Sequence, residues 1–273
     1  MRKLEKQGVT NMSVNGNIGA FITSADTIEI RFSDNEKLDV DHIDENNNEK
    51  FKEFRENENK KEELDYYIQK ILNRNKDLKN IDFEEEYRIL KALRNEFSAN
   101  DIEIRVDANG AFQATEALRD LERLATLQLH SIEQPISAGQ WEAMAELCEQ
   151  TPLAIALDEE LIGVFTREEK QRLLREIQPQ YIILKPSLIG GYSSSEEWIT
   201  LSETLGIGWW VTSALESNIG LNAIAQWTYT LHSSMPQGLG TGTLYTNNIP
   251  FPLYVKNGHL GFNPCERVTF PFS

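Results

Sequence analysis

Four charged residues that could act together in chemistry recur at matched intervals along the chain. They are Asp107, Glu133, Asp158 and Lys185, each of which directly follows a short stretch that is predicted to be a strand. The separations are 26, 25 and 27 residues, about the length of one strand, one helix and their loops. Consecutive parallel strands would therefore place all four side chains at the same end of a sheet.

Three carboxylates at one point repel each other unless a cation lies among them. Ligand sets made only of oxygen suit a hard ion, so we expect Mg²⁺ first and Mn²⁺ second. Asp107, Glu133 and Asp158 are the predicted ligands, and Lys185 would lie beside the ion, where a substrate would bind. The alternative for each acidic residue is an N-cap of the following helix, which does not account for the matched spacing of all four.

The elements that must position these residues begin near residue 81. Strands are predicted at 102–106, 129–132, 153–157, 181–184 and 209–212, and helices lie between them, one opened by a capping box of Thr166 and Glu169. The alternation predicts an α/β fold with a parallel sheet, which could be doubly wound or closed. Only a (β/α) barrel gathers the four residues around one mouth, so a TIM-like barrel is predicted.

The first 80 residues differ in character. From Asp34 to Asp65 there are 13 acidic and 6 basic residues, too many charges to bury a core of their own. A strand is predicted at 25–32 and an amphipathic helix at 64–72. We therefore expect an atypical N-terminal segment at 1–80 and a barrel domain at 81–273.

Composition narrows the classes of partner. The formal net charge of −16 argues against nucleic acid, because phosphate requires a basic surface. No stretch approaches the roughly 20 apolar residues of a membrane span. Cys148 and Cys265 fit no metal-ligand spacing, and Cys148 is predicted to be a core residue. We expect a cytoplasmic protein that binds a small molecule, and nothing indicates its oligomeric state.

Several motifs carry a resemblance to a known family. The stretches 105–112 (RVDANGAF), 131–135 (SIEQP), 156–160 (ALDEE) and 184–187 (LKPS) look like barrel motifs of the enolase superfamily. The stretches 213–222 (SALESNIGLN) and 238–242 (GLGTG) look more particularly like the o-succinylbenzoate synthase family. The resemblance covers roughly Ile81 to Arg267.

The resemblance implies a mechanism. The metal on Asp107, Glu133 and Asp158 would hold the substrate carboxylate and stabilise an enediolate as the α-proton leaves, with Lys185 facing the reacting carbon. The reaction would be dehydration to 2-succinylbenzoate, a carbon–oxygen lyase step towards menaquinone. The substrate pocket would be lined at three positions: Ser213, Ser217 and Gly240.

The chain departs from the family pattern in two places. A Lys-x-Lys motif is expected shortly before residue 82, with its lysines at positions 75 and 77, but the chain has Lys76 and Lys79 in the spacing Lys-x-x-Lys. Lys79 is the candidate second lysine, which requires a local shift of the chain by two residues. Residues 1–80 are also too short for the family's usual capping domain and first barrel strand. Two alternatives therefore stay open: N-acylamino acid racemase or dipeptide epimerase activity, and a non-catalytic metal-binding remnant.

Overall fold

The structure is a computed structural model that describes residues 12–14, 31–32, 83–96, 98–100, 102–239, 248–249, 252–256 and 259–263. The helix predicted at 64–72, most of the strand predicted at 25–32, Lys79 and Gly240 lie outside the described residues.

A curved sheet of parallel strands forms the centre of the described part. Its strands in spatial order include β3 (Ile102–Asp107), β4 (Ser131–Glu133), β5 (Ile155–Leu157), β6 (Tyr181–Leu184) and β7 (Gly208–Val211). Each of these pairs in parallel with the next one along the chain. The predicted strands are confirmed, with β4 and β7 displaced by one or two residues.

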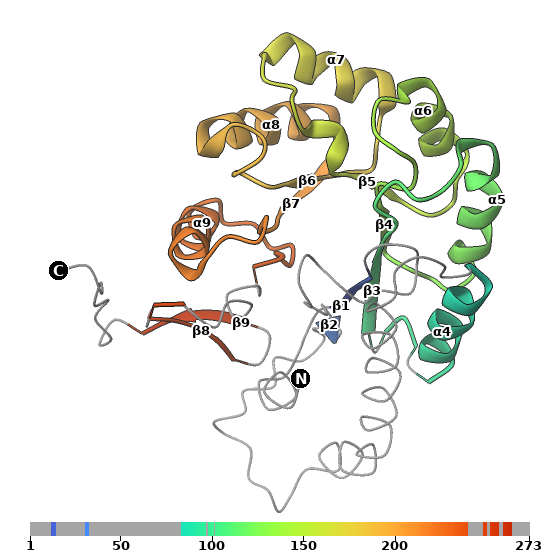
Figure 1. Cartoon of the computed structure of the whole chain (residues 1–273), viewed down its shortest axis with the longest axis horizontal. Coiled ribbons are helices and arrows are strands. Elements are labelled where there is room, and N and C mark those ends of the chain that lie inside the picture. The colour runs from blue at the N-terminus through green and yellow to red at the C-terminus, as the bar shows by residue number, and fades with distance from the viewer. Residues whose placement is uncertain are drawn as a thin grey trace, which may run out of the picture.

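The helices that the structure describes all lie on one face of this sheet, its convex outer side (Figure 1). They are α4 (Phe83–Glu96), α5 (Ala114–Ala125), α6 (Trp141–Gln150), α7 (Arg167–Ile177), α8 (Gly191–Leu205) and α9 (Asn218–Thr230). A doubly wound sheet would carry helices on both faces. The one-sided, sequential arrangement is that of a (β/α) barrel, as the spacing of the charged residues predicted.

Side chains on each strand alternate between the two faces, and this decides which residues enter the core. Val106, Ile132, Leu157 and Leu184 point towards the helices and belong to one large buried cluster. Ala156, Ile183 and Trp210 form a second, smaller buried cluster. Since residues two apart share a face, Lys185 projects from the same face of β6 as Ile183.

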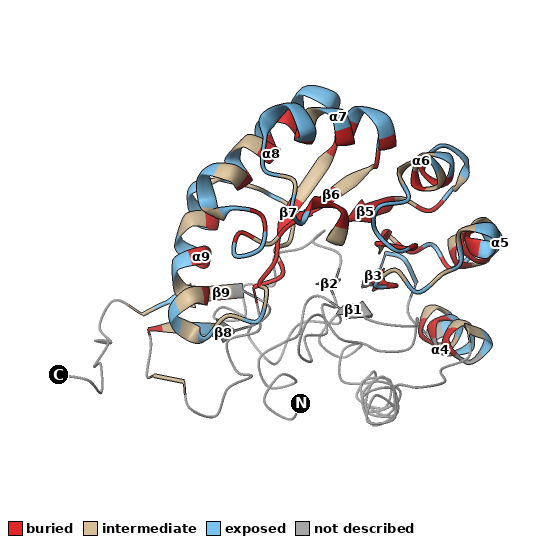
Figure 2. Ribbon diagram, turned by 45° about the horizontal axis from the view of Figure 1, so that its top comes forward, coloured by how far each residue is buried: buried red, intermediate tan, exposed pale blue. Residues whose placement is uncertain are grey.

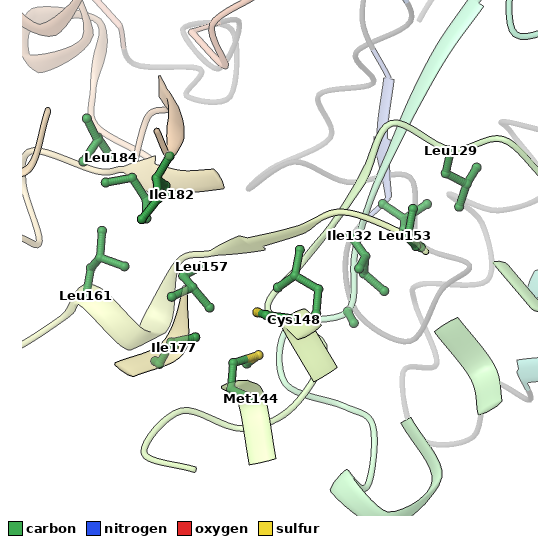
Figure 3. Close-up of a cluster of buried hydrophobic side chains, with 14 of the residues drawn as sticks. Leu129, Ile132, Met144, Cys148, Leu153, Leu157, Leu161, Ile177, Ile182 and Leu184 are labelled. Atoms are coloured by element: carbon green, nitrogen blue, oxygen red, sulfur yellow. The ribbon is translucent and has the colours of Figure 1, made fainter. Parts of the chain in front are cut away.

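The helices bury the stripe that faces the sheet and expose the opposite side (Figure 2). Between β5, β6 and helices α6 and α7, the core packs Met144, Cys148, Leu157, Ile177 and Ile182 (Figure 3). The core position predicted for Cys148 is confirmed, since its residue is only 7% exposed.

The N-terminal half of α7 starts as predicted. The Thr166 hydroxyl accepts a hydrogen bond from the Glu169 backbone N–H, and the Glu169 carboxylate accepts one from the Thr166 backbone N–H, which completes a capping box. Helix α8 follows Gly190 and Gly191, whose positive φ angles turn the chain into the helix.

The edge of β3 is covered by two short N-terminal strands. β1 (Met12–Val14) pairs in parallel with Ile104–Val106, and β2 (Arg31–Phe32) pairs antiparallel with residues 102–103. The sequence predicted β2 as part of a longer strand but not β1. These pairings supply hydrogen-bond partners to an edge of β3 that would otherwise be open.

At the other edge, Gly238 forms a parallel bridge with Thr212, beyond β7. The described chain then ends with a separate antiparallel hairpin of β8 (Leu253–Lys256) and β9 (His259–Phe262). In the part of the chain that the structure describes, no helix has the length and apolar character of a membrane span.

Candidate functional site

The four charged residues lie together at the carboxyl end of the parallel strands. Asp107 and Glu133 end β3 and β4 and are direct partners across the two strands. Asp158 and Lys185 each follow the last residue of β5 and β6. The structure therefore brings all four predicted residues to one mouth, which is where the barrel fold places its active sites.

Lys185 joins two of the three carboxylates. Its ammonium group donates hydrogen bonds to Asp158 Oδ2 and, at 3.5 Å, to Glu133 Oε1. The side chain of Lys185 is 14% exposed and that of Asp158 is 3% exposed, so both charges are largely removed from water. A buried ion pair of this kind requires further partners for its remaining charge.

The carboxylates of the site are held close to one another in a buried place. Burial raises the pKa of Asp107 well above its usual range, although the Lys185 charge opposes the rise. Burial, and then the negative charge of Asp107, raise the pKa of Glu133 in the same way. Both shifts arise first from removal of the carboxylates from water, and the neighbouring carboxylates add to them.

A fourth carboxylate, that of Glu159, lies at the same mouth. Burial and the neighbouring charge of Asp158 raise the pKa of Glu159. Its Oε1 accepts a hydrogen bond from Asn109 Nδ2 at 3.0 Å, and the backbone N–H of Asn109 donates to Asp107 Oδ1 at 2.8 Å. Asn109 therefore links the loop after β3 to the loop after β5.

The donor set fits a divalent cation. The described side chains at this mouth offer oxygen ligands from four carboxylates against one ammonium group, and Mg²⁺ prefers such ligands. Among the described residues no three acidic, histidine or cysteine side chains surround one point as metal ligands. The Lys185 ammonium group contacts Glu133 and Asp158 and supplies positive charge between them.

The loop after β7 forms a second polar cluster. Glu216 accepts hydrogen bonds from the Ser213 hydroxyl at 2.6 Å, from the Ala214 backbone N–H at 2.8 Å, and from the Ser187 hydroxyl. Ser213 is fully buried, so its hydroxyl serves the loop rather than facing solvent. Through Ser187, this cluster connects the loops that follow β6 and β7.

The remaining predicted pocket residues stand as follows. Ser217 is the N-cap residue of α9 and makes no side-chain capping bond. The neighbouring Asn218 contacts the segment Asn248–Ile249, which therefore lies against the start of α9. Gly240 and the candidate lysine Lys79 lie outside the described residues.

The sequence reasoning missed several residues that the structure places in the site. Glu159 directly follows Asp158, and Glu216 lies within the stretch 213–222, but the sequence predicted no role for either residue. Gln134 and Glu160 are buried in the loops that carry the predicted ligands Glu133 and Asp158, and they contact each other. The only signal that could have found them is their position beside the predicted site residues, because their roles depend on contacts between different loops.

Comparisons with known proteins agree with this architecture. The model of the family described as "Enolase C-terminal domain-like" matches residues 50–263. An o-succinylbenzoate synthase of Desulfotalea psychrophila is 58% identical over 181 residues, 66% of this chain and 49% of that protein. The crystal structure of MenC from Desulfotalea psychrophila is similar, with a TM-score of 0.65 and 57% identity over 66% of this chain and 51% of that chain.

A more distant relative is named for a different activity. The L-amino acid-D/L-Glu epimerase of Francisella philomiragia is 31% identical over 146 residues, 53% of this chain and 40% of that protein. The chain spans about half the length of the first of these relatives.

Proposed function

Because the chain belongs to the enolase C-terminal domain-like family, we propose that it is a metal-dependent carbon–oxygen lyase that forms 2-succinylbenzoate by dehydration. The observation that carries the proposal is the convergence of Lys185 with Asp107, Glu133 and Asp158 at one mouth of the sheet. The 58% identity to an o-succinylbenzoate synthase supports this substrate in preference to others.

Asp107, Glu133 and Asp158 would hold Mg²⁺, with Mn²⁺ as the second choice. When bound, the ion would supply positive charge beside the substrate carboxylate, which makes the neighbouring carbon more acidic. Binding would also release Lys185 from its role as the counter-charge of Asp158.

Lys185 would then face the reacting carbon. Burial lowers its pKa, but the charges of Glu133 and Asp158 outweigh burial and raise the pKa of Lys185 above its usual range. With these partners Lys185 is a cation, so its contribution in this arrangement is electrostatic. A second lysine is required to take the α-proton and to deliver a proton to the departing hydroxyl, and Lys79 is proposed for it.

Glu216 would hold the loop after β7 as one wall of the pocket. Ser213, Ser217 and Gly240 belong to the proposed substrate pocket. Since the Ser213 hydroxyl donates to Glu216, its effect on the substrate would pass through the conformation of the loop. A small-molecule carboxylate as the partner, a cytoplasmic location and a barrel domain at 81–273 belong to the same proposal.

The test is an assay of the chain with Mg²⁺ and a cyclohexadiene carboxylate, the proposed substrate. Formation of the aromatic product, 2-succinylbenzoate, measures the turnover. A Lys79→Met variant should lose product formation, while the matched Lys76→Met variant should retain it. Equal activity of the two variants would remove Lys79 from the mechanism.

A racemase or epimerase activity is the second candidate, and the similarity to the Francisella epimerase favours it. Exchange of a substrate α-proton for deuterium without loss of water would establish this activity instead. Metal binding without either reaction, in a folded protein, would indicate a non-catalytic remnant.

A further inference from the structure

We infer that Gln134, paired with Glu160, is a positioning residue that holds the three metal-ligand loops in one arrangement. The inference rests on the metal site of the proposed function and names residues that contact no substrate or metal themselves. It is carried by the hydrogen bonds that the buried side chain of Gln134 and its backbone N–H and carbonyl make.

The backbone of Gln134 ties the flanking strands to β4. Its N–H donates to the Ala156 carbonyl in β5 at 2.9 Å. Its carbonyl accepts from the Gly110 N–H, in the loop after Asp107, at 2.6 Å. Gln134 directly follows Glu133, and its backbone N–H and carbonyl contact the strand that precedes Asp158 and the loop that follows Asp107.

The chain takes an unusual conformation to make these bonds. The φ angle of Gln134 is 36°, in the left-handed region that residues other than glycine rarely adopt. Surrounding contacts must hold such a conformation, and it occurs often at functional sites. Here the contacts come from the side chain of the same residue.

The Gln134 carboxamide is 0% exposed, and each of its polar atoms has partners. Its Oε1 accepts from the backbone N–H groups of Asp158 at 3.1 Å and Glu160 at 3.4 Å. Its Nε2 donates to the Ile136 carbonyl at 3.0 Å and to Glu160 Oε2 at 3.1 Å. The amide therefore fixes the backbone of the predicted ligand Asp158.

Glu160 completes the link between the two loops. It is 4% exposed, and its Oε1 accepts from the Gly139 N–H at 2.8 Å while Oε2 accepts from Gln134. The loop after β4 and the loop after β5 are thus bonded in both directions. A change of either side chain leaves buried donors or acceptors without partners, which is costly.

Metal ligands tolerate little displacement, since a site works within about 0.5 Å of its productive geometry. Groups behind the ligands commonly change metal affinity by about 10- to 100-fold when they are substituted. Gln134→Leu removes all four side-chain bonds. Gln134→Glu keeps the acceptor for Asp158 and Glu160 but places a carboxylate oxygen against Glu160.

The experiment is titration of Mg²⁺ alone into the full chain by calorimetry. We expect Gln134→Leu and Gln134→Glu to weaken Mg²⁺ binding about 10-fold or more. The double variant Gln134→Glu with Glu160→Gln should recover part of the affinity, since it restores the pair between positions 134 and 160 but not the bond to the Ile136 carbonyl. In this double variant, the carboxylate at position 134 accepts hydrogen bonds from the backbone N–H groups of residues 158 and 160. The amide at position 160 donates to that carboxylate and accepts from the Gly139 N–H.

Gln180→Leu is the matched control. The Gln180 amide also bridges two backbone groups, Ile155 N and Cys148 O, but at the opposite end of β5. Gln180→Leu should lower the free energy of unfolding and leave the Mg²⁺ affinity unchanged. Hydrogen exchange at the Asp158 and Glu160 amides should quicken in Gln134→Leu and not in Gln180→Leu.

The outcomes separate the two proposals. A folded wild-type chain that binds no Mg²⁺ would contradict both the proposed metal site and this inference. Wild-type binding that is unchanged in folded Gln134 variants would overturn the inference alone. If Gln134→Leu does not fold, equal affinities of Gln134→Glu and the double variant would overturn it.

Discussion

The Lys185 ammonium group is hydrogen-bonded to Asp158, the residue predicted as a metal ligand one strand away. The same group reaches Glu133 Oε1 at 3.5 Å, so one cation serves two predicted ligands. In the proposed function, Lys185 and a metal ion would compete for the same carboxylates.

Substitution of Lys185 separates these two roles. Lys185→Met should abolish turnover, yet bind Mg²⁺ more tightly than the wild-type chain because the competing cation is gone. Without metal it should be destabilised by about 3 kcal/mol, since removal of one partner leaves buried charge uncompensated. Urea unfolding with and without Mg²⁺ measures this, and weaker Mg²⁺ binding would contradict the competition.

Asp158→Asn should have the opposite effect on metal binding. The substitution removes one ligand charge and the main partner of Lys185. Mg²⁺ affinity should therefore fall at least about 10-fold, because substitution even of residues that only support a ligand lowers metal affinity by about 10- to 100-fold. Calorimetric titration checks it. Asp120→Asn is the control, because Asp120 lies on helix α5 and pairs with Arg119. An equal loss in both variants would argue against a specific site.

Truncation of a core side chain behind the strands should lower stability and leave the candidate site in place. Ile177 is fully buried on α7 and faces β5 and β6 (Figure 3). Ile177→Ala should lower the free energy of unfolding by about 2–5 kcal/mol through lost contacts and a cavity. Denaturant unfolding measures it. Substitution of its exposed neighbour Glu176 by Ala should cause no comparable loss.

Cys148 should make stability fall in alkaline solution. Burial raises the pKa of its thiol from 9.0 to about 12. Between these values the unfolded chain has released the proton and the folded chain retains it, so unfolding becomes more favourable as pH rises. Below pH 9 both states hold the proton and the effect vanishes.

The measurement compares unfolding free energies at pH 8 and about pH 11 in a Cys265→Ser background. Adding Cys148→Ala should reduce the loss of stability between the two pH values. The thiol should also react slowly with an alkylating reagent at neutral pH until the chain is unfolded. Rapid labelling of the folded chain would show that the thiol is accessible.

Much of the fold followed from local patterns. The apolar strands, the helices between them and the Thr166 capping box could be predicted because each depends on residues that are near in sequence. The β1 strand could not, since three residues carry no periodicity and their pairing with β3 is a contact between distant segments.

The sequence by itself determined that Asp107, Glu133, Asp158 and Lys185 share one end of a parallel sheet. The similar spacing of the four residues, each after a strand of one parallel sheet, places them at the same end of that sheet. Only the tertiary structure decided that Lys185 contacts Glu133 and Asp158, that Glu216 binds Ser213, and that Gln134 binds Glu160. Those contacts join loops on different strands, so they depend on strand register and loop conformation, which no local sequence pattern specifies.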